Sequence, residues 1–271
     1  MSSAVSDALV VNEVVEPGLV RLILNRPNAF NALSEAMLTA LQTELDAIAA
    51  NPTIRVVIIA GAGKAFCAGH DLKEMRAAYQ DAKSVDYYHS LFAQCSNMML
   101  SLQKMPQPVI AQVHGIATAA GCQLVAMADL AVADAGTRFA VSGINYGLFC
   151  STPAVGLSRN MLRKQAMEML LTGDFIDAAQ AKGQGLINQM VSAEELPQAA
   201  LNLAHKIIAK PEAAVRMGKQ LFYSQLEVSI KQAYQMAGQT MACNMMDSNA
   251  LEGVGAFLQK RSPIWRSDQS A

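Results

Sequence analysis

The sequence predicts an α/β fold followed by an all-helical region, and three observations support this prediction. Short apolar runs alternate with segments of helical periodicity through most of the chain. Residues 55–60 are continuously apolar after Arg55, as in a strand buried on both faces of a parallel sheet. After about Leu196 the pattern becomes wholly helical. Strands that alternate with helices in this way favour right-handed crossover connections.

The expected elements follow in chain order. Residues 10–15 and 19–25 read as paired strands, and Ser34 then precedes a helix that carries a leucine-rich face at Leu38, Leu41, Leu45 and Ile48. Residues 83–104 are expected to be helical, and the sequence MPQP ends that helix before a strand at residues 109–113. A short helix leads to a further strand at residues 130–133. No flexible linker or low-complexity segment interrupts the chain.

Composition limits the classes of partner. The chain has 271 residues, of which 52% are hydrophobic and 16% charged, and its formal net charge is −1. Near-neutrality without blocks of like charge argues against a nucleic acid or an anionic membrane as a partner. With 16 methionines and few charges, a single copy would expose much apolar surface, which favours an oligomer.

Five cysteines occur without C-x-x-C spacing, so we expect reduced thiols and no metal. Residues 1–7 have no basic start followed by an apolar run, and no apolar segment approaches the ~20 residues that span a bilayer. These features predict a soluble, cytoplasmic protein.

A dinucleotide site is one alternative, because residues 56–63 (VVIIAGAG) place G-x-G after a strand. The third glycine is missing, helical periodicity does not begin at once, and no acidic residue ends a following strand. The sequence therefore disfavours this reading.

Two turns of small residues are more informative. Residues 66–73 (FCAGHDLK) and 115–124 (GIATAAGCQL) each follow an apolar strand-like run. Small residues let the main chain approach a ligand closely, and a helix that opens after the turn adds unpaired N–H groups. Two such turns could hold one oxygen between them and stabilise negative charge on a carbonyl.

At these residues the chain resembles the crotonase, or enoyl-CoA hydratase/isomerase, superfamily. The resemblance extends to LNRP with NAL at residues 24–33 and to FLQKR at residues 257–261, so it spans nearly the whole chain. Residues 119–124 and 147–153 most resemble the divergent branch of enoyl-CoA hydratase domain-containing proteins.

The resemblance implies a spiral of repeated ββα turns at residues 1–195 and a helical oligomerisation region at residues 196–271, forming a trimer or hexamer. It implies an acyl-CoA thioester substrate, a role in fatty acid metabolism and no separate cofactor, since coenzyme A is part of the substrate. The oxyanion-hole amides would be those of His70 and Ala120. Substrate contacts would come from Asn28, Ala29, Ala68, Gly69, Asp71, Lys73 and Lys260. Many relatives have a basic residue where Asn28 stands, and Lys73, Lys64 and Arg26 are possible substitutes.

The acid and base depart from the family pattern. Hydratases of the family have glutamates at two positions that are Gln123 and Gly143 here, and neither residue can move a proton. Asp129 and Asp134 are the only carboxylates between Tyr87 and Met167, and both are expected to have structural roles, as is Asp71 at its loop. The remaining candidates for the pocket are His70, His89, Tyr87, Tyr88, Cys150 and Asn145.

Two hypotheses of different class follow. The first is an enzyme of the enoyl-CoA hydratase type, a lyase, or one with a different family reaction such as isomerisation or thioester hydrolysis. The second is an acyl-CoA binder or assembly partner without catalytic activity. The loss of both glutamates predicts that ordinary hydration is absent or weak.

Overall fold

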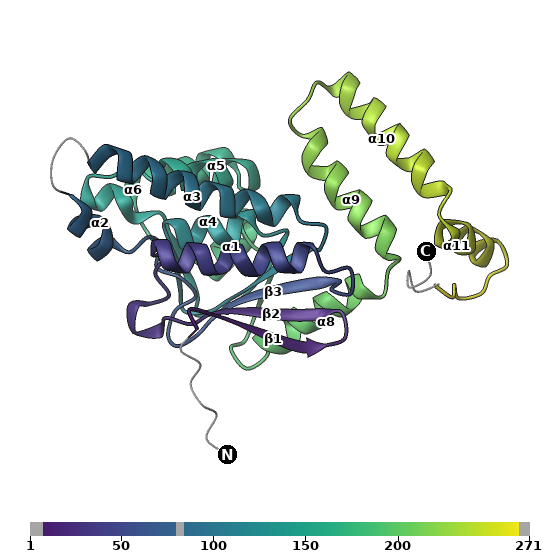
Figure 1. Cartoon of the computed structure of the whole chain (residues 1–271), viewed down its shortest axis with the longest axis horizontal. Coiled ribbons are helices and arrows are strands. Elements are labelled where there is room, and N and C mark those ends of the chain that lie inside the picture. The colour runs from purple at the N-terminus through teal and green to yellow at the C-terminus, as the bar shows by residue number, and fades with distance from the viewer. Residues whose placement is uncertain (1–7, 80–83, 266–271) are drawn as a thin grey trace, which may run out of the picture.

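The computed structural model describes residues 8–79 and 84–265 and confirms the α/β class (Figure 1). A six-stranded sheet has the order β1-β2-β3-β4-β6-β9. Only β1 and β2 are antiparallel among these neighbours; all the other pairs are parallel. The strands of this sheet are β1 (Val10–Glu16), β2 (Leu19–Leu24), β3 (Val56–Gly61), β4 (Val109–Val113), β6 (Leu130–Asp134) and β9 (Gln189–Val191).

A second, three-stranded sheet has the order β5-β7-β8, from β5 (Ile116–Thr118), β7 (Arg138–Ala140) and β8 (Ile176–Asp177). Strands this short show no periodicity in the sequence. The chain also forms the helices η1 (Pro27–Ala29), α1 (Glu35–Ala49), α2 (Leu72–Ala78), α3 (Ser84–Lys104), α4 (Ala120–Met127), η2 (Ser142–Tyr146), α5 (Ser151–Asn160), α6 (Arg163–Thr172), α7 (Ala178–Gly183), α8 (Leu196–Ile208), α9 (Glu212–Gln225), α10 (Ile230–Met245) and α11 (Ser248–Leu258).

The structure confirms the helices and strands that periodicity predicted, to within about a residue at their ends. The expected start of α3, Lys83, lies outside the described residues. Ser34 caps α1, because its side chain accepts a hydrogen bond from the N–H of Met37 at 3.1 Å. No described helix is long and apolar enough to cross a membrane.

The large sheet has apolar side chains on both faces. One face joins the main core beneath α1, α3 and α4 (Figure 1). The opposite face carries Leu19, Val56, Ile58, Ile110 and Val132, which pack against Leu196, Ala200 and Ala204 of α8. This double burial explains the continuous apolar run of β3.

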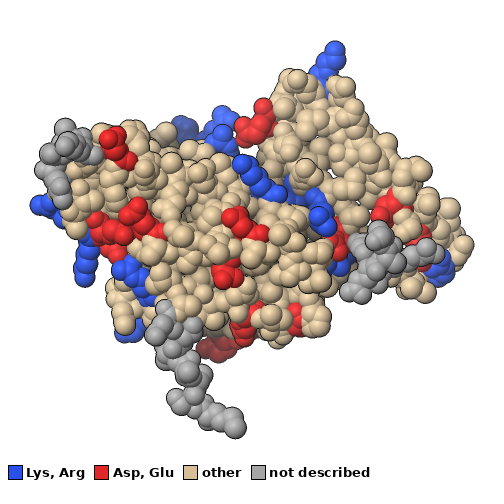
Figure 2. Space-filling view, viewed as in Figure 1, with Lys and Arg blue, Asp and Glu red and all other residues tan. Residues whose placement is uncertain are grey.

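Helices α9, α10 and α11 form an arm that extends away from the sheet (Figure 1). Uncharged residues cover most of the face in Figure 2, on the arm as elsewhere. Several large apolar side chains on the arm face solvent; Met246 and Phe257, for example, are 82% and 81% exposed. The predicted boundary between a core at residues 1–195 and a helical region at residues 196–271 stays a prediction. Of the helices after that boundary, α8 packs on the sheet, and α9, α10 and α11 form the arm.

A buried ion pair joins the arm to the core. The side chain of Lys219, on α9, lies 2.7 Å from a carboxylate oxygen of Asp129 and donates to the carbonyls of Leu102 and Gln107. The hydroxyl of Tyr223 donates to the other oxygen of Asp129 at 2.8 Å. Asp129 therefore has the structural role that the sequence predicted.

Candidate functional site

The two small-residue turns lie side by side. Cys67 pairs with Ala117 as an isolated bridge, and the N–H of Thr118 donates to the carbonyl of Cys67 at 3.0 Å. The hydroxyl of Thr118 donates to the carbonyl of Ala68 at 2.9 Å. Two segments that are about fifty positions apart in the sequence are thus held together by main-chain contacts.

Glycine is required where the turns touch. Gly69 has a φ of +88°, and a Cβ on it would lie 2.9 Å from the Cβ of Ala119 and 3.2 Å from the backbone nitrogen of Ala120. A Cβ on Gly121 would overlap the carbonyl oxygen of Cys67. The missing side chains let the start of α4 come into contact with the first turn.

The backbone N–H groups of His70 and Ala120 are left without partners. Leu33 donates to the carbonyl of Gly69 at 2.7 Å and accepts from Asp71, so the intervening N–H of His70 points the other way. Ala120 is the first residue of α4, whose opening N–H groups have no carbonyl within the helix. Neither N–H donates a hydrogen bond to any described residue.

Ala119, just before α4, has φ 49° and ψ −120°, a conformation that L-residues seldom adopt. Its own N–H donates to the carbonyl of Ala140 on β7 at 2.9 Å, which helps to hold it there. Strain of this kind is concentrated at functional sites, and here it sets the direction of the neighbouring Ala120 amide.

Asn31 braces the first turn from behind, a role that the sequence did not reveal. Its buried side-chain amide donates to the carbonyls of Ala62, Ala65 and Phe66 at 2.8–3.1 Å. Its side-chain oxygen accepts the N–H of Arg26 at 2.9 Å. Asn31 has a φ of 55°, which asparagine tolerates better than most residues.

A cavity of about 500 Å³ opens at the two turns. It is within the usual size range of small-molecule sites. Among the described residues, no Asp, Glu, Lys or Arg lines it. Its walls consist of Ala68, His70, Leu72, Met75, Phe92, Thr118, Ala119, Ala120, Ser142, Gly143, Tyr146, Leu148, Phe149, Cys150, Ser151, Thr152 and Pro153.

His70 supplies the imidazole of this cavity. Both ring nitrogens are buried and have no hydrogen-bond partner among the described residues, and the ring makes an edge-on contact with Phe92. Burial lowers the pKa of His70, and the adjacent backbone of Leu33 opposes this less strongly. The ring is therefore mainly neutral at pH 7, with one of its two buried nitrogens unprotonated.

The two positions of the absent glutamates differ in their surroundings. Gln123 is 4% exposed on α4 and does not line the cavity, and its side-chain oxygen accepts no hydrogen bond from the part of the chain that the structure describes. A Cβ on Gly143 would lie 2.5 Å from the carbonyl oxygen of Leu148 and 2.7 Å from the sulfur of Cys150. Gly143 is not in the left-handed region, so space rather than conformation requires glycine there.

Cys150 occupies the space beside Gly143. Burial raises the pKa of its thiol, which stays protonated at neutral pH. Burial likewise raises the pKa of Cys67, Cys95 and Cys122 to about 12, whereas Cys243 is exposed on α10.

The other candidates for the pocket do not reach it. His89 is exposed on α3. The hydroxyl of Tyr88 donates to the carbonyl of Met75 at 2.9 Å, and that of Tyr87 is buried without a partner outside the cavity. The amide of Asn145 contacts the carbonyl of Gly173 at 3.4 Å. Asp134 has the expected turn role, since it accepts from the N–H of Gly136.

Asp71 caps α2, as predicted. Its carboxylate accepts the N–H groups of Lys73 and Glu74 and lies 2.7 Å from the guanidinium of Arg26. Burial acts to raise the pKa of Asp71, but the Arg26 side chain and the two backbone N–H groups together hold it below the usual range. This carboxylate is thus occupied by intramolecular partners.

The remaining predicted substrate contacts lie outside the cavity walls. Asn28, Lys73 and Lys260 are exposed, and Ala29 lies on η1. Lys260 follows α11 at the end of the arm and has a φ of 52°. Of the predicted site residues, the structure brings His70, Ala120, Gly143 and Ala68 together around one cavity.

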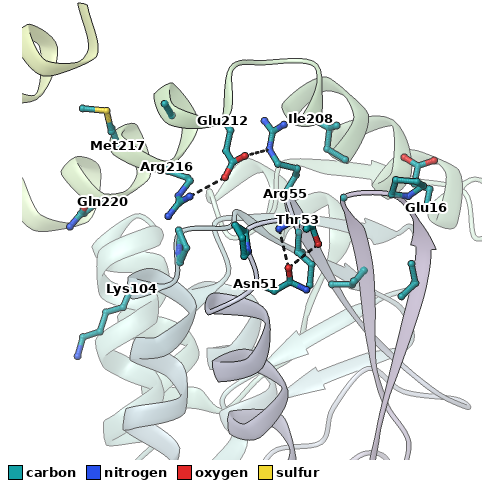
Figure 3. A pocket seen from close by; sticks show the side chains of 18 residues that line it. Glu16, Asn51, Thr53, Arg55, Lys104, Ile208, Glu212, Arg216, Met217 and Gln220 are labelled. Carbon is teal, nitrogen blue, oxygen red and sulfur yellow. Dashed lines mark hydrogen bonds and ion pairs between the residues drawn. The ribbon is translucent and has the colours of Figure 1, made fainter. Parts of the chain in front are cut away.

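A larger hollow, of about 1190 Å³, lies between the core and the start of α9 (Figure 3). Glu212 stands between Arg55 and Arg216 there, at 3.6 Å and 3.0 Å (Figure 3). Arg55 also donates to the carbonyl of Lys210 at 2.8 Å. Glu212 thus pairs with both arginines, and neither small-residue turn reaches this hollow, so the smaller cavity is the better candidate site.

Comparisons with known proteins agree with this geometry. The family model described as "Enoyl-CoA hydratase/isomerase" matches residues 15–268. The mouse protein named "Enoyl-CoA hydratase domain-containing protein 3, mitochondrial" is 43% identical over 92% of this chain and 82% of its own. A solved enoyl-CoA hydratase structure from Mycobacterium smegmatis has a TM-score of 0.92 with 59% identity, covering 96% of this chain and 99% of that one. Human enoyl Coenzyme A hydratase domain-containing protein 3 has a TM-score of 0.89 with 41% identity, covering 95% and 100%.

The prediction of a cytoplasmic location is wrong on this comparison, because the mouse, frog and human relatives are named mitochondrial. A targeting segment decides location, while composition and the fold of the mature chain do not. The residues used for that prediction, 1–7, lie outside the described part of the chain.

Proposed function

Because the chain belongs to the enoyl-CoA hydratase/isomerase family, we propose that it binds acyl-CoA thioesters with the carbonyl oxygen between the N–H groups of His70 and Ala120. The observation that supports this most directly is that both residues line one cavity and neither N–H group has a partner among the described residues. Backbone donors of this kind stabilise charge that develops on a carbonyl oxygen, and they act without rearranging.

Hydration by a pair of glutamates is not part of this proposal. No carboxylate lines the cavity among the described residues, and Gln123 and Gly143 stand at the two positions. A general acid or base is worth about 10²–10⁴-fold in rate. We therefore expect hydration of crotonyl-CoA to be absent or far below that of an ordinary hydratase.

The presence of His70 supports a second candidate function, in which the protein catalyses a thioester reaction other than hydration by two glutamates. His70 lines the cavity, and both of its buried ring nitrogens lack a hydrogen-bond partner among the described residues. Under this proposal the neutral imidazole accepts a proton from the acyl chain or from water. Isomerisation would use the first of these transfers, and thioester hydrolysis the second. A binder without any turnover remains the competing hypothesis.

The test combines binding with turnover. Calorimetry should show that crotonyl-CoA binds more tightly than free coenzyme A, and a panel of enoyl- and acyl-CoAs should be assayed for double-bond migration, hydration and thiol release. His70→Ala removes the imidazole but leaves the backbone N–H, so it should abolish turnover and preserve binding. His89→Ala is the matched control, because His89 is exposed and away from the cavity.

Three results would contradict parts of the proposal. Failure of every thioester to bind better than coenzyme A would exclude the carbonyl site. Turnover unaffected by His70→Ala would exclude His70 as the base. Efficient hydration unaffected by both histidine variants would show that another group activates water.

For assembly, we propose a trimer or a hexamer in which the arm contributes much of the contact. The exposed apolar side chains on α10 and α11 support this, since a monomer would leave them in water. Lys260 would then be offered to a neighbouring copy's ligand from the end of the arm. Light scattering tests the assembly, and a mass equal to one 28.9 kDa chain at micromolar concentration would refute it.

A further inference from the structure

The described walls of the cavity carry no charged side chain, although charged residues are close to it in the chain. Leu72 and Met75 of α2 line the cavity. The charged neighbours on the same turn face elsewhere: Asp71 binds Arg26, and Glu74 accepts the N–H of Glu35 at 3.1 Å. The sequence of α2 therefore places its apolar side chains toward the cavity and its charges outside.

The opposite walls continue this pattern. Phe92 of α3 is half-buried against His70, and Tyr146, Leu148 and Phe149 form the wall between η2 and α5. Their polar neighbours are hydroxyls: Ser142, Ser151 and Thr152 line the cavity as well. None of these side chains carries a charge.

An acyl chain that ends in a carboxylate would bind more weakly here than an uncharged one, because the carboxylate would lose water at these walls. Removing an ion from water is unfavourable unless a counter-charge is present, and the described walls have no charged side chain to pair with it. Burial keeps the imidazole of His70 neutral at pH 7, so it does not provide that charge. An uncharged acyl chain instead gains from the aromatic and aliphatic walls.

We propose that this site selects thioesters whose acyl group is uncharged and rejects those whose acyl chain ends in a carboxylate. The proposal rests on the acyl-CoA function proposed above, and it names the class of acyl group that the same cavity takes.

The first test measures binding by calorimetry at neutral pH for two pairs of ligands, butyryl-CoA with succinyl-CoA and hexanoyl-CoA with adipoyl-CoA. The members of each pair have equal carbon numbers and differ in a terminal methyl or carboxylate. We expect the uncharged member to bind at least about tenfold more tightly in both pairs. A smaller difference in either pair overturns the selection proposal but leaves acyl-CoA binding intact. Thioesters that bind no better than coenzyme A would overturn the function as well.

The second test places a cation in the wall. Leu72 is exposed at the rim, so Leu72→Lys should fold, and melting temperature verifies this. We expect the preference for hexanoyl-CoA over adipoyl-CoA to fall by about tenfold, because the lysine can pair with the carboxylate. Leu171→Lys, on an exposed position of α6 outside the cavity, is the matched control and should leave the ratio unchanged. An unchanged ratio in folded Leu72→Lys, or an equal change in the control, would overturn the proposal.

Discussion

Gly69→Ala tests whether contact between the two turns positions the Ala120 amide. The added Cβ would lie 2.9 Å from the carbonyl oxygen of Thr118 and 3.2 Å from the nitrogen of Ala120, at a φ of +88°. The left-handed conformation costs an L-residue about 1–2 kcal/mol. A methyl group forced into a packed contact costs about 1–3 kcal/mol more. We therefore expect a loss of about 2–5 kcal/mol in the free energy of unfolding, measured by urea denaturation.

Gly147→Ala separates the two contributions. Gly147 also has a positive φ, +78°, but nothing lies within 4 Å of an added Cβ. It should lose only the conformational part, about 1–2 kcal/mol. Calorimetry should further show that Gly69→Ala binds butyryl-CoA at least about tenfold more weakly, because the Ala120 amide is displaced. Equal destabilisation by the two substitutions, or full thioester affinity in Gly69→Ala, would refute the reasoning.

Lys219→Met should lower the free energy of unfolding by about 3–5 kcal/mol in urea denaturation, because Asp129 is left in the interior without its cation. Adding Asp129→Asn should recover part of that loss. If the losses of the two single variants simply add in the double variant, the pairing is contradicted. The pKa of Asp71 is lowered in the folded state, so its carboxylate stabilises the fold above its ordinary pKa, and that contribution is lost as pH falls through the lowered folded value. Asp71→Asn should therefore be less stable than wild type at neutral pH and show a flatter decline below about pH 4, with parallel pH curves counting against the prediction. Iodoacetamide at neutral pH should add one group, at Cys243, because the other thiols are buried and have raised pKa values. The intact mass of the protein, with and without the Cys243→Ser substitution, measures this addition. Alkylation of Cys150 in the native protein would contradict the prediction and show that the cavity thiol is reactive.

The large elements were predictable from the sequence because their signals are local. The face of α1 repeats at helical spacing, and Ser34 can be recognised as a cap from its place before that face. The run at residues 55–60 predicted a strand buried on both sides, which β3 confirms. The strands β5, β7, β8 and β9 have three residues or fewer and follow no period that a sequence can show.

The site was predictable only in part. The paired turns predicted unpaired backbone N–H groups, because glycine and alanine before a helix are visible in the sequence, and the resemblance to the crotonase superfamily assigned these groups to His70 and Ala120. Which face of α3 points into the protein was not, so His89 was a candidate although it is exposed and Phe92 reaches the cavity. The brace at Asn31 and the crowding at Gly143 depend on carbonyls supplied by other segments. Neither leaves a local pattern.

The ion pair between Lys219 and Asp129 divides the arm into parts with different dynamics. Opening α9 would take Lys219 away from Asp129 and leave the carbonyls of Leu102 and Gln107 without their donor, whereas α10 has no buried residue among its described positions. Amide hydrogens of α9 should therefore exchange with solvent only when the sheet itself opens, and those of α10 should exchange through local opening in an isolated copy. The chain thus presents two cooperative units, with their border in the turn between α9 and α10 and not where the sheet ends.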